Sequence, residues 1–205
     1  MRFGPELREL GPHQFTVELD GCLEVYAAAM GAPRIQLPGR RSIMEQHTGY
    51  PSFRAIAARA GGRPAPWRPH GHPVIAFAYG FHGAHGQWWH DLVRSALTVT
   101  RGGPEAEAWT ADSFEIAEVH VHPDYQGHGI GREMMLRLAA GRPERTSLLS
   151  TPDADTRARR LYHRLGFHDL LTGFSFAGAG PPYAVMGTVL PLQDDQPPDP
   201  PPGGP

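Results

Sequence analysis

Residues 115–132 read EIAEVHVHPDYQGHGIGR, and this stretch decides the fold of the chain. In its first half, Ile116, Val119 and Val121 are spaced three and then two residues apart. That spacing is typical of a strand with a bulge, which changes the side chains that face the core. Pro123 lacks the backbone N–H that a strand ladder needs. The sequence therefore predicts a bulged strand that ends before Pro123.

The second half of the stretch is a glycine-rich turn, Gln126 to Gly131, that leads into a helix. We expect this helix to reach about Ala140, because Gly141 and Pro143 follow. In such a turn successive backbone N–H groups face one point, and the helix dipole favours negative charge there. The turn therefore predicts a phosphate-binding site.

Two common nucleotide-binding motifs do not fit this turn. A dinucleotide fingerprint GxGxxG needs a third glycine at position 132, where the chain has Arg132. A phosphate-binding loop of the NTPase type needs a lysine, and all 19 basic residues of this chain are arginine. The pattern that remains is Q-x-x-G-x-G.

A second motif lies about thirty residues further on and reads as a helix. An apolar stripe with helical spacing ends at Gly166-Phe167, and Asp155 is expected to cap the helix. With the turn at 126–131 before it and a short strand at 147–150 between, the chain resembles the GNAT superfamily of acetyl-CoA-dependent N-acetyltransferases over about residues 74–190. The second motif consists of Asp155, Ala158, Leu161, Tyr162, Gly166 and Phe167.

The resemblance implies acetyl-CoA as the co-substrate and no metal. Pantetheine would bind like an extra strand to the backbone of the bulged strand, and the amides of the turn would hold the pyrophosphate. Asp155 stands where the family usually has an Asn that bonds to pantetheine, so its role is either this contact or helix capping alone. The cofactor-binding candidates are Val119, His120, Val121, Gln126, Gly127, His128, Gly129, Ile130, Gly131, Arg132 and Asp155.

The resemblance also implies catalytic roles for a reaction in which an amine attacks the thioester directly. Tyr162 occupies the family's position for the acid that protonates the departing thiolate, and a phenol is suited to that task. The amide of Val119 would polarise the carbonyl. For the base, Glu115, Glu118 and His120 stay open as alternatives.

The order of the expected strands and helices, together with the resemblance, predicts an α/β fold. This fold is a three-layer mixed sheet of about six to seven strands with a bulged, splayed central strand and flanking helices. We expect one N-acetyltransferase domain over residues 1–192 and a Pro-rich disordered tail over 193–205. Residues 53–59 fit a strand and a helix equally well. The expected strands are 15–19, 73–81, 147–150, 171–176 and 183–190, and the expected helices are 21–30 after an Asp20 cap, 41–47 and 87–97.

Composition excludes several other classes of protein. The formal net charge of −2 offers no strong attraction for nucleic acid, and no apolar run is long enough to span a bilayer. These features predict a cytoplasmic protein with neither a nucleic acid nor a membrane as partner, and leave a homodimer open. Cys22 is the only cysteine and is expected in the core. The spacing of His70, His72, His82, His85 and His90 matches no common metal site.

The acceptor is expected to be a small-molecule primary amine. Ser150 replaces the Glu of bacterial protein N-terminal acetyltransferases, although a protein N-terminus or lysine stays an alternative. The pocket should involve the N-terminal helices, the Trp88-Trp89 region and residues 181–183. A rival of another class is a non-catalytic acyl-CoA-binding or sensor protein. The arginines at 157, 159, 160 and 164 offer either one contact to the CoA 3′-phosphate or a solvated helix face.

Overall fold

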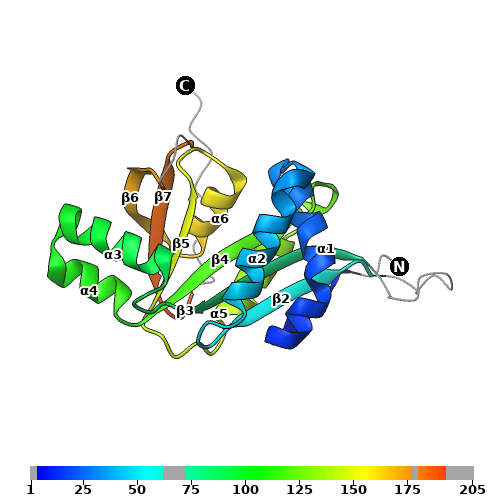
Figure 1. Cartoon of the computed structure of the whole chain (residues 1–205), viewed down its shortest axis with the longest axis horizontal. Coiled ribbons are helices and arrows are strands. Elements are labelled where there is room, and N and C mark those ends of the chain that lie inside the picture. The colour runs from blue at the N-terminus through cyan, green and yellow to red at the C-terminus, as the bar shows by residue number, and fades with distance from the viewer. Residues whose placement is uncertain (1–3, 62–72, 177–179, 193–205) are drawn as a thin grey trace, which may run out of the picture. The chain divides into compact units, whose positions relative to one another are not determined.

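The computed structural model describes residues 4–61, 73–176 and 180–192. The predicted tail at 193–205, most of the loop before Pro73, His70 and His72 lie outside these residues. Seven strands are hydrogen-bonded in the order β1-β2-β3-β4-β5-β7-β6 (Figure 1). This confirms the predicted α/β fold with six to seven strands. The elements are β1 (Glu6–Leu10), α1 (Pro12–Met30), η1 (Arg34–Gln36), α2 (Leu37–His47), β2 (Arg54–Arg59), β3 (Val74–His82), α3 (Trp88–Arg101), α4 (Gly103–Thr110), β4 (Ser113–Val121), η2 (Pro123–Tyr125), α5 (Ile130–Ala139), β5 (Thr146–Pro152), α6 (Arg157–Arg164), β6 (His168–Phe174) and β7 (Tyr183–Val189).

The chain divides into two compact units, which we describe separately. Unit 1 comprises residues 1–82 and 115–138, and unit 2 comprises residues 83–114 and 139–205. The single domain over 1–192 and the bulge in β4 stay predictions. Within the described residues, no helix is both long and apolar enough to cross a bilayer.

The first long helix of unit 1 covers residues that were predicted as a strand. The predicted strand 15–19 is wrong, because these residues belong to the 19-residue helix α1. Phe15 and Leu19 are four residues apart and both fully buried, as on one face of a helix, whereas Val17 between them is exposed. Pro12 at the first helical position starts the helix, and Asp20 lies inside it rather than capping it.

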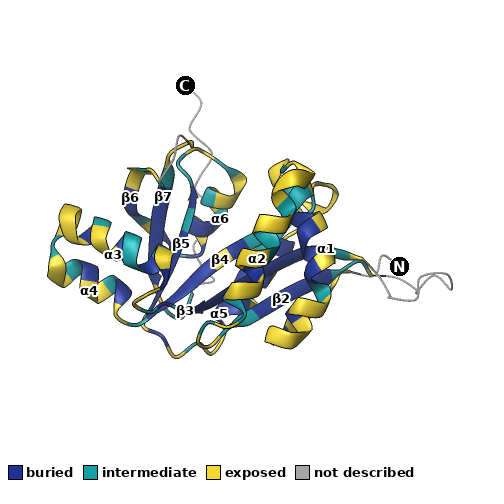
Figure 2. Cartoon of the chain, in the orientation of Figure 1, coloured by how far each residue is buried: buried dark blue, intermediate teal, exposed yellow. Residues whose placement is uncertain are grey.

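The core of unit 1 lies between helix α1 and the antiparallel strands β2 and β3. The Phe15 ring packs edge-on against Tyr79 with 5.1 Å between centroids. Cys22 is buried here, as predicted, and burial raises the pKa of its thiol. Residues 55–58 of β2 are buried on both faces, which Figure 2 shows as a continuous dark strand. On the face opposite α1, Arg54 donates a hydrogen bond to the Leu138 carbonyl at the end of α5 (3.3 Å).

Unit 2 is built on the antiparallel strands β5, β7 and β6. Helices α3 and α4 pack against one another, and Val93 and Leu97 of α3 join Leu148 of β5 and Val185 of β7 in one core. Helix α4 was not predicted, because it begins with Gly103 and Pro104 directly after Gly102, and such a Gly-Gly-Pro sequence reads as a loop. The expected helix 21–30 is only the second half of α1, which begins nine residues earlier at Pro12. The remaining expected helices and strands are confirmed within a few residues at their ends, and the ambiguous stretch 53–59 contains strand β2.

Candidate active site

The predicted phosphate turn lies wholly within unit 1, between β4 and α5. Gly127 and Gly129 have φ of 81° and 78°, a conformation that residues with a Cβ rarely adopt. No atom would meet an added Cβ within 4 Å at either position, so the space beside the turn is open. The amide of Glu133 donates to the Gly129 carbonyl at 3.0 Å. As a rule, the N–H groups in the first turn of a helix have no acceptor within the helix itself and can face a ligand.

Hydrogen bonds hold this turn against the end of β4. The Gln126 side-chain amide donates to the Val121 carbonyl at 3.0 Å, and a ring nitrogen of His128 lies 3.2 Å from the Tyr125 carbonyl. Ile130, the first residue of α5, is buried, whereas Arg132 is exposed. The turn is therefore fixed at both ends, with its glycines on the outside. An open, positively polarised helix end of this kind fits the pyrophosphate of coenzyme A.

Of the three candidate bases, Glu118 and His120 are brought together. The Glu118 Oε2 and the His120 Nε2 are in direct hydrogen-bond contact, and both side chains are about nine-tenths buried. The His120 ring lies edge-on to Tyr26 of α1 at 5.2 Å and 5.4 Å from the Phe77 ring. Glu115, the third candidate, is buried with 2% of its surface exposed.

Glu118 has a second partner that the sequence analysis did not predict. The Arg40 Nη1 of α2 donates to the Glu118 Oε1 at 2.8 Å, and the guanidinium lies over the Tyr26 ring, 4.7 Å from its centroid. Burial alone would raise the pKa of Glu118. The hydrogen bond of His120, the charge that this ring carries once protonated, and the charge of Arg40 outweigh burial and hold the pKa of Glu118 below its ordinary value. The carboxylate therefore stays ionised.

Two further groups border this cluster, and both are neutral at pH 7. Burial, followed by the Arg40 charge, lowers the pKa of His47 to about 4, although Glu118 acts in the opposite direction. Burial and the Glu118 charge raise the pKa of the Tyr79 phenol. The Tyr79 hydroxyl and the His47 Nδ1 are 2.9 Å apart, so the two neutral groups share a hydrogen bond.

Tyr162, the proposed acid, lies on α6 in unit 2. Its side chain is buried with 6% exposed, and its ring centroid is 6.0 Å from that of Phe167. The predicted Asp155 cap is wrong, because the Thr156 hydroxyl accepts from the Arg159 amide at 3.1 Å and caps the helix. The Asp155 carboxylate instead pairs with Arg160. A side-chain oxygen placed one residue later reaches the helix amides, while Asp155 is left on the surface.

The arginines of α6 differ in their partners. Arg159 donates to Asp153 and Asp169 with both ends of its guanidinium and is largely buried, so it belongs to the framework of unit 2. Burial opposes the charge of Arg159, but the Asp169 hydrogen bond outweighs it and raises the pKa of the guanidinium. Arg160 is engaged by Asp155. The solvated face of α6 is thus interrupted by two ion-pair networks.

The two adjacent tryptophans of α3 have different surroundings. Trp89 packs against the core of unit 2, whereas Trp88 is exposed and its ring lies 5.8 Å from that of Phe176. A ring nitrogen of His85 contacts the Asp91 carboxylate at 2.9 Å. Within the described part of the chain, no three His, Cys, Asp or Glu side chains are arranged to hold a metal ion.

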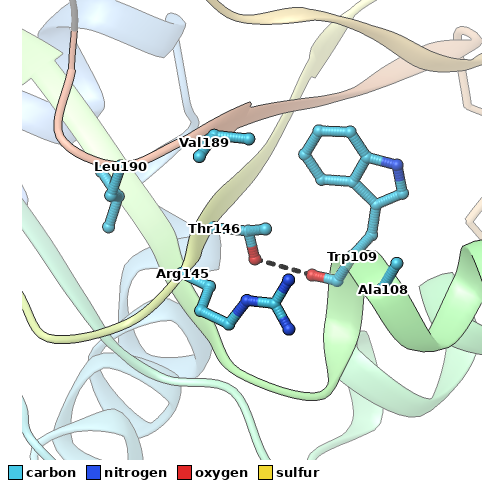
Figure 3. A pocket seen from close by; sticks show the side chains of 6 residues that line it. All are labelled: Ala108, Trp109, Arg145, Thr146, Val189 and Leu190. Carbon is cyan, nitrogen blue, oxygen red and sulfur yellow. Dashed lines mark hydrogen bonds between the residues drawn. The ribbon is translucent and has the colours of Figure 1, made fainter.

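A shallow cavity of about 380 Å³ lies elsewhere in unit 2 (Figure 3). The Thr146 hydroxyl in its wall donates to the Trp109 carbonyl at 2.8 Å. None of its lining residues belongs to the predicted site, so it does not bear on the reaction. The lining residues are Ala108, Trp109, Arg145, Thr146, Val189 and Leu190.

Known proteins resemble this chain in sequence and in fold. A family described as "Acetyltransferase (GNAT) domain" matches residues 94–169. A GCN5-like protein acetyltransferase of Mycobacterium tuberculosis is 35% identical over 204 residues, which cover 91% of this chain and 98% of that protein.

Solved structures match the fold at lower identity. An acetyltransferase of Salmonella typhimurium, solved with its cofactor acetyl-CoA, has a TM-score of 0.54 and 17% identity, covering 94% of this chain and 98% of its own. The protein PH1933 of Pyrococcus horikoshii has a TM-score of 0.61 and 15% identity, with 92% and 100% covered. Because the mycobacterial relative is 35% identical and matches along nearly the whole chain, this chain belongs to the GNAT superfamily of N-acetyltransferases.

Proposed function

We propose that this enzyme transfers the acetyl group of acetyl-CoA to a primary amine, with the turn from Gln126 to Arg132 holding the CoA pyrophosphate. The observation that carries the proposal is the turn itself. Gly127 and Gly129 adopt positive φ beside open space at the start of α5, so the first amides of the helix are accessible to an anion. Pantetheine would follow the backbone of Val119 to Val121.

The reaction needs one proton acceptor and one proton donor. The amine nitrogen bonds to the thioester carbon, the C–S bond breaks, and the amine proton passes to a base. We assign this base to the Glu118–His120 pair, because the two side chains are in contact, whereas Glu115 is almost completely buried. Tyr162 gives its hydroxyl proton to the departing CoA thiolate, an assignment that rests on the family pattern. The Val119 amide polarises the carbonyl.

Two classes of amine are candidates for the acceptor. A small-molecule amine is favoured by Ser150, which replaces a Glu of the bacterial protein N-terminal acetyltransferases. A lysine or N-terminus of a protein is favoured by the name of the mycobacterial relative, a protein acetyltransferase. The exposed Trp88 ring and the half-buried Phe176 ring offer an aromatic surface suited to either kind of amine.

A thiol-release assay tests the activity and separates the two acceptors. Acetyl-CoA is incubated with the full chain and with a panel of polyamines, aryl-alkyl amines, aminoglycosides and lysine-containing peptides, and free CoA is measured. We expect release that depends on one class of amine. Binding of acetyl-CoA without release for any amine would instead support the non-catalytic alternative.

A Tyr162→Phe variant tests the role of the proton donor. Loss of a general acid should lower kcat by about 100-fold or more and leave the Kd for acetyl-CoA nearly unchanged. The control is Tyr50→Phe, which removes a hydroxyl that accepts an exposed hydrogen bond from Gln46 at 3.1 Å. Equal turnover in the two variants would refute the assignment of Tyr162.

A further inference from the structure

One side chain in the Glu118 cluster has no role in the family pattern quoted above. Arg40 comes from α2, 78 residues before Glu118 in sequence, and its guanidinium takes one oxygen of the carboxylate while His120 takes the other. Its side chain is 32% exposed, whereas that of Glu118 is 9% exposed. A buried carboxylate with both oxygens engaged has a fixed orientation and fixes that of its partners.

We infer that Arg40 is a positioning residue that acts through Glu118 to hold the His120 imidazole as the proton acceptor. The inference rests on the proposed function of the site. Because the guanidinium fixes one oxygen of the Glu118 carboxylate, the other oxygen orients the ring through Nε2 and stabilises the imidazolium that forms when the ring takes a proton. Arginine suits this role because it does not release its own proton in proteins.

The groups around His120 support this division of roles. From α1 the ring meets Tyr26, from β3 it meets Phe77, and on its own strand it meets Glu118. Two more groups, His47 of α2 and Tyr79 of β3, interact electrostatically with Glu118 and are neutral at pH 7. The exchangeable proton of this cluster is therefore shared between Glu118 and His120. The positive charge of Arg40 disfavours its position on the Glu118 carboxylate.

The inference is tested by the titration of His120 in the full chain, followed by NMR with labelled histidine. The chain has 12 histidines, and the His120 signal is assigned by its loss in His120→Gln. Arg40→Gln removes a positive charge near the ring, so the imidazolium is less repelled and the titration midpoint should rise by roughly half to one pH unit. Glu118→Gln removes a negative charge and should move the midpoint in the opposite direction.

Two variants serve as controls. Arg40→Lys keeps the charge, so the midpoint should stay close to that of the unchanged protein, while the loss of the fixed guanidinium geometry lowers kcat. Arg41→Gln, at the neighbouring position, removes a surface ion pair with Asp20 and should alter neither the midpoint nor the turnover. In Arg40→Gln we expect kcat to fall by about 10-fold or more, with the KM for acetyl-CoA within about twofold.

An unchanged midpoint in Arg40→Gln would overturn the inference, and so would a moved midpoint with unaltered kcat for an amine accepted in the thiol-release panel. If Arg40→Gln does not fold, Glu118→Gln carries the test, since an unmoved midpoint there also overturns it. The titration needs no acceptor amine. A panel in which no amine is acetylated would therefore refute the proposed function while the coupling of Arg40 to His120 is still read directly.

Discussion

Replacing Gly129 by alanine should weaken acetyl-CoA binding more than it weakens the fold. Gly129 has φ of 78°, and an added Cβ meets no atom within 4 Å, so the substitution introduces backbone strain without a clash. That strain costs about 1–2 kcal/mol, which corresponds to a fall in Tm of about 2–8 °C for a chain of this size.

The loss of affinity is worked out from the amides of the turn. If the strained turn withdraws one amide from the pyrophosphate, a hydrogen bond to a charged group worth about 1.5–3 kcal/mol is lost. The Kd for acetyl-CoA should then rise by about 10- to 100-fold. Isothermal titration calorimetry measures this Kd, and thermal unfolding without ligand measures the cost to the fold.

Gly141→Ala is the matched control for this prediction. Gly141 follows the C-terminal end of α5, has φ of 65° and is also open to an added Cβ. The two substitutions should therefore destabilise the protein by similar amounts, while only Gly129→Ala loses affinity. Equal acetyl-CoA affinities in the two variants would show that the pyrophosphate does not bind at this turn.

Two further predictions concern stability. Thr156→Ala should destabilise the fold by about 1 kcal/mol because α6 loses its cap, whereas Asp155→Ala, which removes only a surface pair with Arg160, should change the free energy of unfolding by less than about 0.5 kcal/mol in urea denaturation. The pKa of His47 is lowered to about 4 in the folded protein, so the unfolded chain binds the proton first as pH falls. Stability should therefore drop between about pH 6.5 and pH 4, by on the order of 2 kcal/mol after allowing for the partial exposure of the ring. His47→Gln should flatten this part of a Tm-against-pH curve, and an unaltered curve would contradict the assignment.

The parts of the fold that were predicted from the sequence carry strong local signals. The turn at 126–131 and the ends of α5 and α6 are marked by glycine and proline, whose backbone preferences act within a few residues. The prediction of a strand at 15–19 was wrong because the sequence FTVEL alternates between apolar and polar residues as a strand does. Only the burial of Phe15 and Leu19, with Val17 exposed, distinguishes the helix from a strand. Strand β1, with a mostly charged and exposed sequence, gives almost no apolar signal.

The candidate site was predicted only where its residues lie close together in the chain. Glu118 and His120 are two residues apart on one strand, so their contact follows from strand geometry. Arg40, Tyr26, His47 and Tyr79 were missed, because each reaches the cluster from another element and nothing in the local sequence marks it. In a chain whose 19 basic residues are all arginine, one more arginine carries no signal until its partner is known.

Because the basic residue of the Glu118 cluster is an arginine, Arg40, and not a lysine, the cluster contains a permanent positive charge. A lysine buried beside a carboxylate can lose its proton, whereas an arginine remains charged at any pH the protein survives. With Arg40 permanently cationic and both His47 and Tyr79 neutral at pH 7, a proton taken from an incoming amine has only Glu118 or His120 to occupy. The lowered pKa of Glu118 disfavours protonation of its carboxylate, so the proton goes to the His120 imidazole. Arg40 contributes to this lowering after His120 itself, so the arginine that orients the carboxylate also helps to keep the proton off it.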